Sequence, residues 1–305
     1  MSDFTALRGV VCPIVSPCST DGGVDYDCLL ENLTRLLRAP ITGFYVCGGT
    51  GDGSRLTTDE RRRTAELTIA RARAAGRRSI VHVGQTLQRQ ALLLADHAMA
   101  QGADAIASVP PQGSWEETTA YYTALAAEAP VFIYYIPGLT HVSADYGQLR
   151  RLLDIPGVAG IKVSDWNIFL IRRIKADYPE KIVYTGLDEM VAPGLLYGAD
   201  GTIGTWINLL PEFYCKLWAL TQAGGQCDAV QQLQTAYTDF LCKGWQFGIL
   251  DAFQELMCAR GYAARCFRAP SVWQPGSMPK PLLEEMLRGL DMLNALAAGL
   301  SYPQS

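Results

Sequence analysis

Short apolar runs alternate with segments of helical pattern eight times along this chain, and this alternation constrains the fold more than any other feature. The runs are rich in valine and isoleucine and are bounded by glycine or proline, as buried parallel strands are. They span residues 9–15, 43–47, 79–84, 105–109, 131–137, 158–163, 181–186 and 201–207. Eight such units predict a closed (β/α)8 TIM barrel; a doubly wound open sheet is the alternative, but the count of eight favours closure.

The segments between the runs carry apolar residues at helical spacing. Helices are expected at residues 58–75, 88–101, 146–153, 167–177, 189–197 and 212–223. Beyond residue 225 no strand pattern appears, and helices are expected at 227–241, 245–260 and 281–298. We therefore expect a catalytic barrel over residues 1–225 and a C-terminal helical extension over residues 226–305.

Charge and cysteine usage exclude several classes of protein. The formal net charge is −4 over 305 residues, which indicates neither a nucleic-acid partner nor a membrane surface. The first 15 residues hold one basic residue and no long apolar run, so neither a signal peptide nor a membrane span is expected. Nine cysteines without a C-x-x-C pair favour a reducing, cytoplasmic location over a disulfide framework.

Lys162 is the strongest candidate nucleophile. Of six lysines, it alone lies near the end of an apolar run, and strand alternation would place it on one face with Val158 and Gly160. If that face is the barrel interior, desolvation favours the neutral amine, which attacks carbonyl groups. A lysine at a strand end can also pair with a carboxylate, so position alone leaves a structural role open.

Tyr134 lies in the preceding run, and its hydroxyl could relay protons beside an imine. A core tyrosine with a satisfied hydroxyl is the alternative. Tyr135 should point the other way and have a structural role.

Other polar groups follow other runs. The glycine-rich segment 48–53 could hold a substrate carboxylate on its backbone N–H groups and on Thr50, or could be only a tight turn. Asp188 and Glu189 could accept hydrogen bonds from a polyol, or could simply favour a helix N-terminus. Thr205, at the end of the last run, could bind a hydroxyl or be only a β-branched strand residue.

The histidines form no metal-ligand spacing, so no metal and no cofactor is expected. His82 is expected in the barrel core, whereas His141 follows the fifth run and could line the mouth of the site.

Together these positions resemble the family of N-acetylneuraminate lyase and dihydrodipicolinate synthase, and more closely its lyase branch. The resemblance implies a (β/α)8 barrel with C-terminal helices, usually a homotetramer. It also implies a lyase that forms a Schiff base between a lysine and pyruvate or another 2-oxo acid.

The resemblance assigns roles residue by residue. Lys162 matches the Schiff-base lysine, and Tyr134 matches the tyrosine of a Tyr-x-x-Pro motif that ends here at Pro137. The remaining matches are substrate-binding positions: Gly49, Thr50, Ser164, Gly186, Asp188, Glu189 and Thr205.

Three departures from the family pattern bear on the reaction. Gly49 replaces the first hydroxyl residue of the loop, as in dehydratases of keto-deoxy sugar acids. Gln112 and its neighbours carry no aromatic residue, and residues 138–141 lack the arginine that the synthases use as a carboxylate clamp.

The leading hypothesis is an aldolase that cleaves or forms a bond between pyruvate and a sugar-derived aldehyde. A dehydratase of a 2-keto-3-deoxy sugar acid is the second, favoured by Gly49. A binding barrel without turnover is the third, and the intact Lys162 and Tyr134 argue against it.

Overall fold

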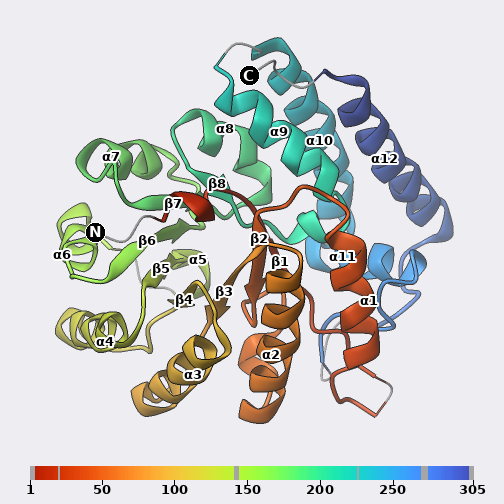
Figure 1. Ribbon diagram of the computed structural model, residues 1–305. Helices are drawn as coiled ribbons and strands as arrows, with labels where there is room; N and C mark the ends of the chain where they lie inside the picture. Colours follow the sequence, from red (N-terminus) through yellow and green to blue (C-terminus); the bar gives the residue numbers. More distant parts are fainter. Residues whose placement is uncertain (1–3, 20, 141–143, 225–226, 269–273, 302–305) are drawn as a thin grey trace.

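Eight parallel strands close into a barrel in the order β1 to β8 (Figure 1). The structure is a computed structural model that describes residues 4–19, 21–140, 144–224, 227–268 and 274–301. The strands are β1 (Gly9–Pro13), β2 (Gly43–Val46), β3 (Arg78–His82), β4 (Ala105–Ser108), β5 (Val131–Tyr135), β6 (Val158–Val163), β7 (Ile182–Thr185) and β8 (Gly201–Thr202). Pairing of β8 with β1 completes the ring. The predicted (β/α)8 barrel is confirmed.

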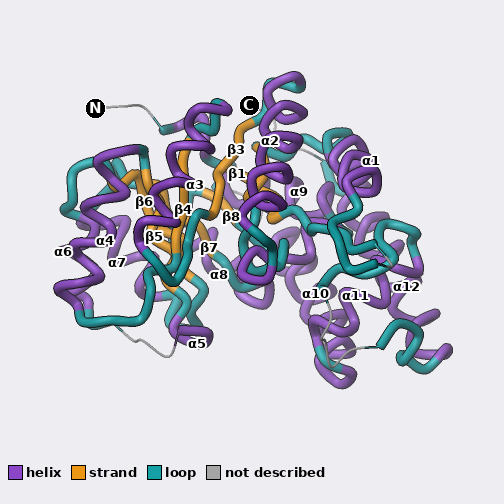
Figure 2. The backbone as a smooth tube through the Cα atoms, turned by 90° about the horizontal axis from the view of Figure 1, so that it is seen from below, coloured by secondary structure: helices purple, strands orange, loops and turns teal. Residues whose placement is uncertain are grey.

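Helices surround the strands on the outside of the barrel (Figure 1). They are α1 (Tyr26–Leu36), α2 (Thr58–Ala74), α3 (Gln88–Gln101), α4 (Trp115–Glu128), α6 (Tyr146–Leu153), α7 (Phe169–Asp177), α8 (Val191–Leu196) and α9 (Pro211–Gln222). The short helix α5 (Pro137–Thr140) follows β5 and lies at one end of the barrel (Figure 2). The sequence analysis did not predict α1, α4 or α5, although Ser114 and Glu117 form a capping box at the start of α4. A short 3-10 helix, η3 (Asp188–Met190), precedes α8.

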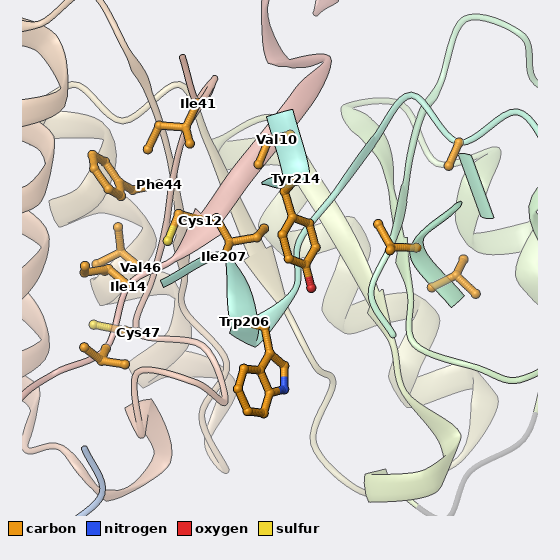
Figure 3. Close-up of a cluster of buried hydrophobic side chains, with 14 of the residues drawn as sticks. Val10, Cys12, Ile14, Ile41, Phe44, Val46, Cys47, Trp206, Ile207 and Tyr214 are labelled. Atoms are coloured by element: carbon orange, nitrogen blue, oxygen red, sulfur yellow. The ribbon is translucent and has the colours of Figure 1, made fainter. Parts of the chain in front are cut away.

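Strand side chains point alternately into the barrel and toward the helices, so the molecule has two hydrophobic clusters. Tyr45, Phe132 and Tyr184 belong to the interior cluster. The outer cluster joins the strands to the helices, and Figure 3 shows part of it, where β1 and β2 lie near Trp206 and Tyr214. The interior is therefore packed with side chains, and chemistry is confined to the ends of the strands.

A bulge in β6 corrects the predicted orientation of its residues. Consecutive residues of β5 pair with Val158 and Gly160, so Ala159 is an extra residue in the strand. Val158 consequently packs in the outer cluster, whereas the ammonium of Lys162 lies over the ring of Tyr45 inside the barrel. The prediction that Lys162 shares a face with Val158 is wrong, because the bulge reverses the alternation.

The eighth strand is shorter than predicted. It ends at Thr202, and the 3-10 helix η4 (Thr205–Asn208) follows, so Thr205 begins a helix and does not end a strand. The side-chain amide of Asn208 donates to the carbonyl of Pro13 over 2.9 Å and ties η4 to β1. A short buried apolar run has no periodicity that separates these two conformations.

Three C-terminal helices lie to one side of the barrel (Figure 2). They are α10 (Cys227–Phe247), α11 (Ile249–Ala259) and α12 (Lys280–Gly299), and both α10 and α12 pack on α9. The break between α10 and α11 falls at Gly248, whose φ of 117° is accessible to glycine, and not at residues 242–244 as predicted. Within the described residues, no helix is both long enough and apolar enough to cross a membrane.

Candidate active site

Lys162 and Tyr134 lie side by side at the C-terminal end of the barrel. The two residues are in register on neighbouring strands β6 and β5. Lys162 is only 6% exposed, and its Nζ atom lies 4.3 Å from the centre of the Tyr134 ring. An amine and a phenol ring therefore share one largely desolvated space, an arrangement that suits imine chemistry.

Two further rings enclose this pair. The Tyr45 ring centre lies 5.2 Å from Nζ of Lys162, and Tyr45, His82 and Tyr134 contact one another edge to face or tilted. Burial, together with the charges of Arg61 and Lys162, lowers the pKa of His82 to about 3. His82 is thus neutral, and it lines the cavity at the end of β3 rather than lying within the core as predicted. Sequence analysis missed Tyr45, although its place in an apolar run gave it an even chance of facing inward.

Thr50 and Thr205 meet although 155 positions separate them in the sequence. Their hydroxyl oxygens are 2.8 Å apart, and the backbone N–H of Thr205 donates to Asp188 over 2.9 Å. The loop after β2, η3 and η4 therefore bring three predicted site residues into one hydrogen-bonded group. Gly49 lies beside Thr50, and a Cβ there would meet no atom within 4 Å, so the loop has room for the hydroxyl residue that the sequence lacks.

Asp188 is held in a low-dielectric position. Burial raises the pKa of its carboxyl to about 7, while a hydrogen bond from the Tyr214 hydroxyl and the charge of Lys162 act in the opposite direction. Its neighbour Glu189 has a different partner, since its carboxylate accepts a 3.0 Å bond from the indole of Trp245. The predicted Asp–Glu pair is adjacent in sequence, but its two carboxylates have different partners.

Ser164 and Gly186 complete the surroundings of Lys162. The Ser164 hydroxyl is buried and has no hydrogen-bond partner among the described residues, so it is available to a ligand. A Cβ at Gly186 would overlap this hydroxyl and lie 2.7 Å from Cε of Lys162. Glycine at this position therefore allows the backbone after β7 to approach Lys162 closely.

A cavity of about 640 Å³ opens at the ends of β2 to β5, beside Tyr134. Its lining includes Gly49, His82 and Gln112, and the described part of the chain contributes no lysine or arginine to it. His141, the other residue predicted at the mouth, lies outside the described residues. Of the predicted site residues only Tyr134 and Gly49 line this cavity. It is large enough for a small ligand, and it offers no cation to a second carboxylate.

Comparison with known proteins places the sequence in a family. The model of the dihydrodipicolinate synthetase family matches residues 6–274. The chain belongs to this family. An N-acetylneuraminate lyase of Enterobacter sp. (strain 638) is 31% identical over 236 residues, which cover 75% of this chain and 78% of the relative. One from Rhizobium meliloti (strain 1021) is 30% identical over 270 residues, or 87% and 89% of the two chains.

Solved structures of other proteins share the fold of this chain. The wild-type sialic acid aldolase of Ruminococcus gnavus matches with a TM-score of 0.84, covering 96% of this chain and 99% of that chain at 24% identity. The resemblance stated from the sequence is confirmed. So is the class of enzyme, a lyase of the class I pyruvate aldolase type.

Proposed function

We propose that this protein is an aldolase of the N-acetylneuraminate lyase type, with Lys162 as its Schiff-base residue. The observation that carries the proposal is the buried Lys162 amine, which lies 4.3 Å from the Tyr134 ring centre at the C-terminal end of the barrel. The names of the relatives from Enterobacter and Rhizobium support the lyase branch.

The reaction follows from these groups. The Lys162 amine attacks the ketone carbon of the 2-oxo acid, and Tyr134 carries protons as the carbinolamine loses water to give an iminium ion. Tyr134, after giving its proton to the departing water, takes a proton from the hydroxyl at C4; the C3–C4 bond breaks, and its electrons move into the iminium to form an enamine. The aldehyde departs, the enamine is protonated at C3, and water releases pyruvate from Lys162.

The remaining site residues would bind the two ends of the substrate. Thr50 and the N–H groups around Gly49 suit the carboxylate, since they lie at a glycine-rich turn. The hydroxylated tail would contact Ser164, beside Gly186, the hydrogen-bonded pair Asp188 and Thr205, and Glu189, whose carboxylate Trp245 holds. Hydroxyl and carboxylate oxygens at these positions suit a neutral polyol.

A panel of polyhydroxylated 2-oxo acids, starting with N-acetylneuraminate, tests this proposal. Mass spectrometry of the products should show pyruvate and an aldehyde. Dehydration keeps the carbon skeleton intact, so a product that has lost only water would assign the chain to the sugar-acid dehydratases. A panel without any turnover would contradict the proposal.

We also propose a homotetramer. Large apolar side chains are exposed in the segment before α7, in α7 and around α8, namely Trp166, Phe169, Leu196 and Tyr197. Exposed apolar residues in such numbers favour contact with another subunit. Light scattering at micromolar concentration should give four times the mass of one chain, and a monomer would refute the proposal.

We further propose that the enzyme works in the cytoplasm. Eight of the nine cysteines are seen as free thiols, most of them buried, which is compatible with a reducing compartment.

A further inference from the structure

The C-terminal helix α10 reaches the segment that carries the Asp188–Glu189 pair. The Gln234 side chain donates to the carbonyl of Glu189 over 3.2 Å and accepts from the N–H of Ala192 over 3.1 Å. Trp245, about three turns further along α10, donates its indole N–H to the carboxylate of Glu189. Both the backbone and the side chain of Glu189 are thus fixed by a helix outside the barrel.

A second set of hydrogen bonds fixes Asp188. The hydroxyl of Tyr237 on α10 lies 2.6 Å from that of Tyr214 on α9, and the Tyr214 hydroxyl donates to Oδ1 of Asp188. The other oxygen, Oδ2, accepts the N–H of Thr205 over 2.9 Å. A Cβ at Gly204 would overlap Oδ1, so the backbone leaves this carboxylate little freedom to rotate.

We propose that Gln234, Tyr237 and Trp245, acting with Tyr214 and here called the α10 clamp, position Asp188 and Glu189 and so determine which aldehyde tail the enzyme accepts. The inference rests on the proposed function, because it assumes that this pair meets the tail. The four clamp residues are positioning residues, since they act through Asp188 and Glu189.

The chemistry of the clamp indicates a neutral, hydroxylated tail. Each carboxylate oxygen can accept more than one hydrogen bond, so the clamp bonds leave acceptor sites for substrate hydroxyl groups. The clamp holds these sites in a fixed direction, and a prearranged acceptor loses less entropy when it binds. When they are ionised, the neighbouring carboxylates of Asp188 and Glu189 would also repel an anionic tail.

The pH dependence of kcat/KM distinguishes a clamp residue that positions Asp188 from one that only packs against it. The groups that act on the Asp188 carboxyl or are affected by it come from several elements: Lys162 on β6, Glu189 beside it, Tyr214 on α9, Tyr237 on α10 and Cys12 on β1. The Tyr214 hydroxyl lowers the pKa of Asp188, so its removal should raise that pKa. The acidic limb of kcat/KM should then move to higher pH by about one unit.

Tyr214→Phe should weaken binding of N-acetylmannosamine, the aldehyde half of N-acetylneuraminate, by about 10- to 100-fold. Titration calorimetry measures this binding without turnover. Trapping of pyruvate by borohydride should be unchanged, because pyruvate has no tail. Trp245→Phe should weaken the same binding by about 2- to 10-fold, since its bond to Glu189 is partly exposed.

Matched variants control for lost stability. Tyr178→Phe removes a tyrosine hydroxyl that donates to Asp154 over 2.7 Å on the outside of the barrel, and Trp218→Phe removes an indole donor to the carbonyl of Asp200. Both should bind N-acetylmannosamine like the wild type, and thermal unfolding should show that all four variants fold.

Equal binding by the clamp variants and their controls, or an unmoved acidic limb in Tyr214→Phe, would overturn the inference. So would a wild-type protein that traps pyruvate on Lys162 but does not bind N-acetylmannosamine at millimolar concentration. The aldolase proposal is judged separately, because it fails only if pyruvate is not trapped on Lys162 or no substrate is cleaved.

Discussion

Lys162→Ala should lose turnover of every 2-oxo acid that the wild-type enzyme cleaves, by about 10⁴-fold or more. Without the amine no iminium forms, and the electrons of the breaking C–C bond have no acceptor. Neighbouring groups cannot substitute, because the described residues around Tyr134 present no second lysine. Steady-state assays of pyruvate release measure the loss.

Lys181→Ala is the matched control for this loss. Lys181 also lies at a strand end, but at the opposite end of the barrel, where its ammonium donates to the carbonyl of Val158 over 2.5 Å. This variant should keep nearly full activity. Comparable losses in both variants would mean that the effect is one of folding, and full activity in Lys162→Ala would exclude the proposed mechanism.

Condensation of pyruvate with aspartate semialdehyde should be slower than action on a polyhydroxylated substrate by about 30- to 5,000-fold in kcat/KM, equivalent to roughly 2–5 kcal/mol. The semialdehyde carries its own carboxylate, which needs a cationic partner in a partly desolvated site. The described lining of the cavity contains no lysine or arginine. His82 is neutral, because burial lowers its pKa to about 3.

The carboxyl of Asp188 adds to this discrimination. Its pKa of about 7 means that its negative charge grows as the pH rises through neutrality, so repulsion of an anionic aldehyde should increase in the same direction. A coupled reductase assay detects the cyclised product. Robust formation of dihydrodipicolinate would place the enzyme in the synthase branch of the family.

Much of the barrel could be predicted because buried parallel strands have a distinct sequence pattern. All eight strands fall within the predicted runs or one residue outside them. The orientation of Lys162 relative to Val158 could not be predicted, since the bulge at Ala159 leaves no mark in the sequence. The 3-10 helix at Thr205 was equally hidden, because Trp206 and Ile207 continue the apolar run that includes the preceding strand.

Part of the candidate site could likewise be predicted from the sequence, and part could not. Lys162, Tyr134, Thr50 and Asp188 could be predicted because each follows or ends a strand, where barrel chemistry is found. Tyr214 and Trp245 lie on helices beyond the barrel strands, and they reach the site only through the packing of α9 and α10. No local pattern identifies such contacts, because tertiary structure alone brings them together.

Reduction of the enzyme with borohydride in the presence of pyruvate, followed by peptide mapping by mass spectrometry, tests the central claim most directly. The hydride converts the imine into a stable secondary amine and so records which lysine formed it. We expect the adduct on the peptide that contains Lys162, with none in protein treated with borohydride alone. An adduct on any other lysine, or no adduct from an enzyme that still releases pyruvate, would contradict the account.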